Sequence, residues 1–158
     1  MKLSKEEKSY IAGFLDGDGS IHVRLKPNRT YRYKFQISPA VVFYQSAKEE
    51  NHLKWLNKLS GVGYIRKRND GIVEFVIGDS EGIIFLLRNI LPYLRIKNRQ
   101  AKLMLEIIEL KKNVKTANDF LKIAKKIDIF QKINYSKKRI INSLEVEKVL
   151  KEEKLLTP

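Results

Sequence analysis

Two aspartates separated by a single glycine lie where an N-terminal helix is expected to end. They are Asp16 and Asp18, on either side of Gly17. Acids at a helix C-terminus oppose the helix dipole, so this arrangement costs stability unless a cation binds. Free carbonyl oxygens and a carboxylate are the ligands that a hard divalent ion such as Mg²⁺ accepts. Asp-Gly pairs also form ordinary turns, and the spacing alone does not separate a metal site from a turn.

The helix that positions these acids is expected to begin after Ser4. Ser4 and Glu7 form a capping box, and the glycines that follow Asp16 predict the end of the helix. Gly13 and Gly17 are four residues apart, so they share one helix face. A face with so little side chain lets a second helix approach closely.

Residues 11–19 read Ile-Ala-Gly-Phe-Leu-Asp-Gly-Asp-Gly, which closely resembles the nine-residue signature of the LAGLIDADG homing endonucleases. The order of the later motifs resembles the single-motif branch of that family, which is encoded in group I introns and acts as homodimers. The resemblance runs from about Ser4 to about Ser143. It implies an α+β fold, the αββαββα homing-endonuclease fold with a saddle-shaped antiparallel sheet and additional C-terminal helices.

The chemistry that the resemblance implies is site-specific cleavage of double-stranded DNA. The implied target is long and near-palindromic, and the product carries 3′ overhangs. Mg²⁺ is the implied cofactor, with Mn²⁺ or Ca²⁺ able to take its place, held by Asp18 and the carbonyl of Gly17. Asp18, Gln45 and Lys97 are the implied catalytic residues, with Gln45 ordering water and Lys97 supporting the reacting phosphate. Without the resemblance, Gln45 reads as an ordinary strand residue and Lys97 as a solvated lysine.

One position departs from the family pattern. Where the family often places a basic side chain after the glutamine, this chain has Glu49, although Lys48 adjoins it. That supporting role therefore stays open.

The resemblance also implies that two copies of the acid-ended helix pack side by side. The implied dimer-interface residues are Ala12, Gly13, Asp16 and Gly17. Cutting both strands of a duplex needs two sets of metal-binding acids, and this chain carries one motif. A homodimer with a two-fold axis accounts for both points and predicts a near-palindromic target.

The composition indicates a compact protein with a polyanionic partner. The chain has 158 residues, of which 43% are hydrophobic, and its 32 Lys and Arg against 18 acids give a net charge of +14. One domain over residues 1–158 is expected, with a core at about 4–95 and C-terminal helices at about 97–154. Nucleic acid is the first partner that such a charge predicts, and no run of eighteen apolar residues suggests a membrane span. The absence of cysteine excludes disulfides and thiol catalysis.

Basic side chains alternate with apolar ones along a hairpin that follows the helix. Ile21, Val23 and Leu25 are expected to face inward, on a strand over 20–26 that pairs with a strand over 31–45. No acid occurs between residues 21 and 47, whereas an ordinary solvated face mixes both signs, so we favour contact with the major groove of DNA. A second hairpin over 62–78 and a basic loop are expected to add further contacts. The predicted DNA-binding residues are His22, Arg24, Lys26, Asn28, Arg29, Thr30, Tyr31, Arg32, Lys34, Gln36, Ser38, Arg66, Arg68, Glu74, Lys137, Lys138 and Arg139.

Two other functions use the same features, and the sequence leaves them open. One is an RNA maturase that helps an intron to splice, because charge does not separate RNA from DNA. The other is a DNA-binding regulator that does not cleave. No targeting segment stands before the first helix, which predicts action in the compartment of synthesis. The heavy use of Ile, Lys and Asn suggests an AT-rich gene, as in a chloroplast, a mitochondrion or a prokaryotic cytoplasm.

Overall fold

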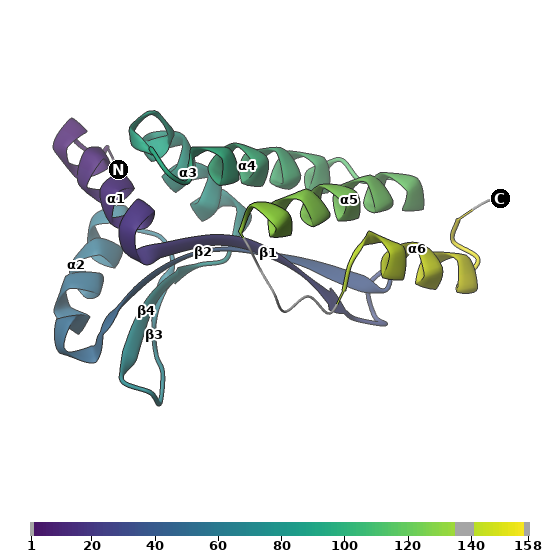
Figure 1. The fold of residues 1–158 in the computed structure, drawn as a ribbon, viewed down its shortest axis with the longest axis horizontal. Helices are drawn as coiled ribbons and strands as arrows, with labels where there is room; N and C mark the ends of the chain where they lie inside the picture. The colour runs from purple at the N-terminus through teal and green to yellow at the C-terminus, as the bar shows by residue number, and fades with distance from the viewer. Residues whose placement is uncertain (1, 135–140, 157–158) are drawn as a thin grey trace. The chain divides into compact units, whose positions relative to one another are not determined.

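The computed structural model describes residues 2–134 and 141–156. The helices and strands follow one another in the order αββαββα, and three further helices come after them (Figure 1). Their bounds are α1 (Lys5–Asp18), β1 (Gly19–Pro27), β2 (Phe35–Ser46), the 3-10 turn η1 (Ala47–Glu49), α2 (Glu50–Ser60), β3 (Tyr64–Lys67), β4 (Ile72–Ile77), α3 (Ser80–Ile90), the 3-10 turn η2 (Leu91–Tyr93), α4 (Asn98–Lys112), α5 (Ala117–Ile133) and α6 (Ser143–Glu152). The α+β fold predicted from the sequence is confirmed.

The four strands form one antiparallel sheet in the order β1-β2-β4-β3. In the register of β2 with β4, Phe43 lies opposite Phe75 and Tyr44 opposite Glu74. Phe43 and Phe75 are fully buried and stack with their ring centroids 5.5 Å apart. Alternate residues of β4 therefore point to opposite faces, with Phe75 on the core side and Glu74 on the other side.

The chain divides into two compact units. The first contains residues 1–21 and 40–102, and in it α1 packs against α3 and η2 while α2 lies along the β3–β4 hairpin (Figure 1). The second contains residues 22–39 and 103–158, and in it the ring of Tyr33 lies 5.3 Å from that of Phe120 and its hydroxyl donates to the Lys115 carbonyl. The expectation of a single domain stays a prediction.

Local signals at the two ends of α1 act as the sequence predicts. The Ser4 hydroxyl accepts from the Glu7 N–H, and the Glu7 carboxylate accepts from the Ser4 N–H at 2.7 Å. The helix ends at Gly19 with extended backbone. A Cβ on Gly19 would lie 2.5 Å from Leu15 Cδ1 and 2.8 Å from its carbonyl oxygen, so this glycine is required by close packing at the turn into β1.

Two sequence expectations about this part of the fold are wrong. The second strand begins at Phe35 rather than Tyr31, because the chain turns at Lys34 with φ +66° and closes the loop by a bond from Asn28 N–H to the Lys34 carbonyl. The spacing of Trp55 with the leucines of its helix predicts that all of them belong to the core; Leu53 and Leu56 are buried, but Trp55 is 46% exposed. In the part of the chain that the structure describes, no helix has the length and apolarity needed to cross a bilayer.

Candidate functional site

Asp16 is bound within its own unit rather than left free. Its Oδ2 accepts from the backbone N–H groups of Arg95 at 2.7 Å and Ile96 at 3.2 Å, and its Oδ1 accepts from the N–H of Lys97 at 2.9 Å. Burial alone would raise the pKa of Asp16, but these three bonds and the charge of Lys97 outweigh it and leave the pKa below its usual value. The carboxylate thus fixes the segment that leads into α4.

The same contact fixes the side chain of Lys97. Its Nζ donates to the backbone carbonyl of Asp16 at 2.6 Å, within the last turn of α1. A positive charge there offsets the negative end of the helix dipole. The two hydrogen bonds between Asp16 and Lys97 therefore hold the Lys97 ammonium group at the last turn of α1, next to the residue two positions before Asp18.

Asp18 is the acid that remains available at the end of α1. It is exposed, and its carboxylate has no bonding partner among the described residues. The carbonyl of Gly17 belongs to the last turn, where carbonyl groups have no partner further along the helix. These oxygen donors fit a hard divalent cation. Within residues 2–134 and 141–156 no three acids or histidines converge.

Gln45 is not joined to the other two predicted catalytic residues. It lies near the end of β2, opposite Val73, and is half-buried. Among the described residues it has no hydrogen bond to Asp18 or Lys97. The structure therefore brings Lys97 to the end of α1 and leaves the role of Gln45 a prediction.

The glycine face of α1 is open. Gly13 and Gly17 are exposed, and a Cβ built on either would meet nothing within 4 Å. Ala12, by contrast, is fully buried in the single chain, and its place at a dimer interface stays a prediction. Asp16 is turned toward Lys97, as described above. The exposed stripe thus consists of the two glycines and the residues that flank them.

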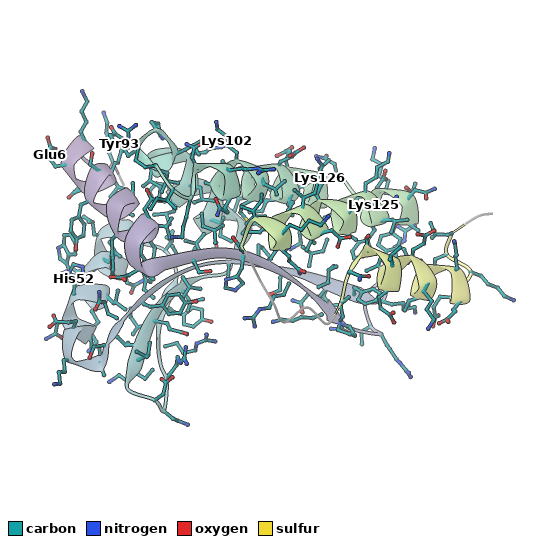
Figure 2. All side chains as sticks on the ribbon, in the orientation of Figure 1. Glu6, His52, Tyr93, Lys102, Lys125 and Lys126 are labelled. Atoms are coloured by element: carbon teal, nitrogen blue, oxygen red, sulfur yellow. The ribbon has the colours of Figure 1, made fainter. Side chains whose placement is uncertain are left out.

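Exposed apolar side chains flank this stripe. Tyr10 lies one turn before Gly13 and is 46% exposed; its hydroxyl is 2.7 Å from Nε2 of His52, which Figure 2 labels on α2. The His52 ring stacks on Trp55 at 5.5 Å, and Tyr10 meets the same indole edge-on at 5.8 Å. Beside the Asp16 contact, Ile96 is 71% exposed. The sequence analysis missed this feature; the signal that could have indicated it is an aromatic residue, Tyr10, three positions before Gly13.

The basic hairpin of the second unit has the predicted alternation. Ile21, which ends the first unit, and Val23 and Leu25 are buried, whereas Arg24 and Lys26 are exposed and form no ion pair within the described residues. Further along, the loop residues Arg29, Thr30, Tyr31 and Arg32 are also exposed, whereas His22, Asn28, Lys34, Gln36 and Ser38 are half-buried. The predicted contacts Lys137, Lys138 and Arg139 lie outside the described residues.

The hairpin of the first unit differs from its expectation at one residue. Arg66 and Arg68 are exposed, but Glu74, which was expected to lie outward beside them, is only 3% exposed. It shares their face of the sheet and is covered by their guanidinium groups. The carboxylate is thus part of the sheet surface without being open to solvent.

A helix with an open glycine stripe that ends on a free carboxylate, followed by two ββα units with arginine-bearing strands, is the arrangement of a homing-endonuclease fold. The comparisons with known proteins agree. The model of the LAGLIDADG endonuclease family matches residues 11–103. The chain therefore belongs to the LAGLIDADG endonuclease family.

Relatives match almost the whole chain. DNA endonuclease I-CreI of Chlamydomonas reinhardtii is 35% identical over 150 residues, which cover 94% of this chain and 91% of the relative. DNA endonuclease I-CvuI of Chlorella vulgaris is 34% identical over 143 residues, which cover 90% and 89%. A crystal structure of I-CvuI in complex with the I-CreI target in 2 mM Mg superposes with a TM-score of 0.93 over 97% of this chain and 98% of that one. A second I-CvuI complex, with its own target and 2 mM Ca, has a TM-score of 0.92 over 96% and 97%.

Proposed function

We propose that this chain is a site-specific homing endonuclease that acts as a homodimer on a long, near-palindromic DNA duplex and leaves 3′ overhangs. The observation that carries the proposal is the free carboxylate of Asp18 at the end of a helix whose glycine face is open. The family, the DNA-bound relatives and the net charge of +14 support the same activity. The proposal that the protein acts in an organelle or a prokaryotic cytoplasm rests only on the heavy use of Ile, Lys and Asn, which suggests an AT-rich gene.

The metal of the proposed reaction is Mg²⁺, supported by the oxygen-only donors at the end of α1. Asp18 and the carbonyl of Gly17 would hold it, together with the matching groups of a second copy and the DNA phosphates. When bound, a divalent ion activates water and stabilises the oxygens of the phosphate during in-line attack. Asp18 would orient that ligand set, and Lys97 would hold a positive charge near the phosphate, whose oxygens gain negative charge in the transition state. Asp16 keeps the Lys97 ammonium from turning into solvent.

The proposed dimer buries the open stripe of α1. Two glycine faces allow backbone-to-backbone approach, and Tyr10, Trp55 and Ile96 add apolar area on both flanks of the stripe. Each copy then delivers its own Asp18 to the two-fold axis, where both strands of a duplex can be reached.

Gly13→Leu should separate folding from dimerisation. No atom within 4 Å opposes a new side chain at this position, and leucine favours the helix by about 0.5–1 kcal/mol over glycine, so the isolated chain should fold at least as well. In the dimer two leucine side chains, one from each copy, would stand where the helices approach most closely. We therefore expect the dissociation constant of the dimer to rise by about 10²-fold. Sedimentation equilibrium measures this, with Lys122→Leu on the exposed face of α5 as the control. An unchanged dimer constant would contradict the placement of Gly13 at the axis.

Selection of cleavable sites from a randomised duplex library, in Mg²⁺ with an EDTA control, tests the activity directly. We expect one near-palindromic consensus and double-strand products with 3′ overhangs. Selective binding without any product would point to a non-cleaving regulator. Splicing of an intron RNA without any DNA cleavage would point to a maturase.

A further inference from the structure

Helix α5 carries a row of lysines along its exposed side. The exposed positions of this helix follow one another at steps of three or four residues, so they share one side of it. They are Asn118, Lys122, Lys125, Ile129 and Lys132. We call Lys122, Lys125 and Lys132 the lysine row; Figure 2 labels Lys125 on α5. None of these three ammonium groups has a hydrogen bond or an ion pair among the described residues.

The acids near the lysine row are engaged elsewhere. Asp119 accepts from backbone N–H groups at the start of α5, and Asp128 accepts from a backbone N–H at the start of α6. Glu147 of α6 has a lowered pKa, chiefly because of its 2.8 Å bond to Lys151, while the charge of Lys125 adds a smaller effect. The three lysines of the row thus keep their positive charge largely uncompensated.

The lysine row lies on the opposite side of its unit from the basic hairpin. Arg24 and Lys26 point away from the buried face of β1, because successive side chains of a strand alternate between the two faces. The buried side of α5 carries Phe120, whose ring lies 5.3 Å from that of Tyr33 in the hairpin loop. The core of the second unit therefore separates the two basic surfaces, and a straight duplex seated on the hairpin contacts only one of them.

The chemistry of the lysine row suits the phosphates of a duplex. Single strands are bound mainly by stacking of bases on aromatic rings and guanidinium planes, and the exposed positions of α5 offer neither. Lys122 and Lys132 are separated by about 15 Å along the helix axis, which lets the row follow several phosphates of one backbone. A helix that lies on a membrane surface needs a broad apolar face, whereas Ile129 is the one apolar residue on the exposed side of α5.

We propose that the lysine row of α5 binds the phosphate backbone of a second DNA duplex while the strand face of the same protein holds the first. Such a contact does not depend on base sequence. It would keep the protein attached to a neighbouring segment of DNA when it leaves one site, and so assist transfer between segments during the search for a target. The binding of the first duplex rests on the proposed function, whereas the second contact goes beyond it.

A bridging experiment tests the proposal. The duplex chosen by the library selection is fixed to beads in EDTA, so that it stays uncut. The protein is bound to it, excess protein is washed away, and a labelled scrambled duplex is added. We expect the wild type to retain the scrambled duplex. With all three lysines of the row changed to glutamine, retention at about 0.1 M salt should fall about tenfold, and the slope of log retention against log salt should fall by about three.

A matched control removes the same charge from other places. Lys54 of α2, Lys102 of α4 and Lys154 after α6 are also exposed, and a variant with all three changed to glutamine loses three positive charges without touching α5. It should retain the scrambled duplex within about twofold of the wild type. Both triple variants should bind the bead duplex and cleave it in Mg²⁺ with the wild-type kcat within about twofold. Equal loss of retention in the two variants would show that net charge alone is responsible and would overturn the role of α5.

Two further arms identify the partner. An RNA hairpin or vesicles rich in phosphatidylserine replace the scrambled duplex. Retention of either one that depends on the lysine row, with no retention of the scrambled duplex, would overturn the proposal in favour of that partner. A wild-type protein that binds the bead duplex but captures no second duplex would overturn this inference and leave the proposed function intact. A protein that does not bind the bead duplex at all would contradict the proposed function, and simultaneous binding with it.

Discussion

Replacing Asp18 by asparagine is expected to abolish DNA cleavage and to leave duplex binding at least as tight as in the wild type. The variant keeps the shape of the side chain but loses the charge that a divalent ion needs as a ligand. If the bound ion lowers the barrier by several kcal/mol, its loss slows cleavage by roughly 10³-fold or more. Binding gains, because a carboxylate directed at phosphates repels them.

Single-turnover cleavage in Mg²⁺ and filter binding in Ca²⁺ or EDTA measure the two effects separately. Glu147→Gln is a suitable control, since it removes a half-buried carboxylate on α6 that pairs with Lys151 on the same helix. Normal cleavage by the Asp18→Asn protein would remove Asp18 from the metal site. Loss of binding together with cleavage would instead indicate a damaged fold.

The parts of the fold that depend on neighbours in sequence were predictable. The capping box at Ser4 forms as its spacing predicts, and Thr116 with Asp119 and Asn142 with Glu145 cap later helices by the same local spacing. The alternation from Ile21 to Leu25 identified the buried face of β1, because successive side chains of a strand point to opposite faces of the sheet. A resemblance at residues 11–19 then supplied the order of the remaining elements.

The contacts that sequence reasoning missed join residues far apart in the chain. Asp16 reads as a metal ligand or a turn residue by spacing, yet its partners lie 79 to 81 residues away. Glu74 reads as an outward strand residue, and only the reach of the Arg66 and Arg68 side chains shows that it is buried. Trp55 lies between the buried Leu53 and Leu56 in sequence, yet it is 46% exposed and stacks on the ring of His52. In each case the local sequence pattern fits two interpretations, and contacts between residues that are distant in the chain determine which of them is correct.

Removal of the Asp16 carboxylate is expected to reduce both stability and cleavage. Asp16→Ala leaves the N–H groups of residues 95–97 without their acceptor, which should lower the free energy of unfolding by about 2–4 kcal/mol. It also releases the segment that places Lys97, and a misplacement of about 1 Å at a reacting centre slows an enzyme by about 10²-fold. Denaturant unfolding and single-turnover cleavage, at a temperature where the variant is folded, measure the two effects.

The pH dependence of stability gives this prediction a definite sign. Because the pKa of Asp16 is lower in the folded chain than in the unfolded one, the unfolded state binds more protons as the pH falls. The stabilisation is therefore complete above the unfolded value of about 3.9 and is lost as the pH drops through the lower folded value. Stability of the wild type should decline more steeply below about pH 4 than that of Asp16→Asn.

Asp119→Ala is the matched control for Asp16→Ala. Asp119 also accepts from backbone N–H groups, those of Lys115 and Thr116, and its pKa is also lowered by these bonds and by the Thr116 hydroxyl. Its loss should weaken the start of α5 and leave the rate of cleavage by the folded protein unchanged, since its carboxylate binds the backbone just before its own helix. If the folded Asp16→Ala protein also cleaved at the wild-type rate, Asp16 would be a helix anchor only, and Lys97 would find its place without it.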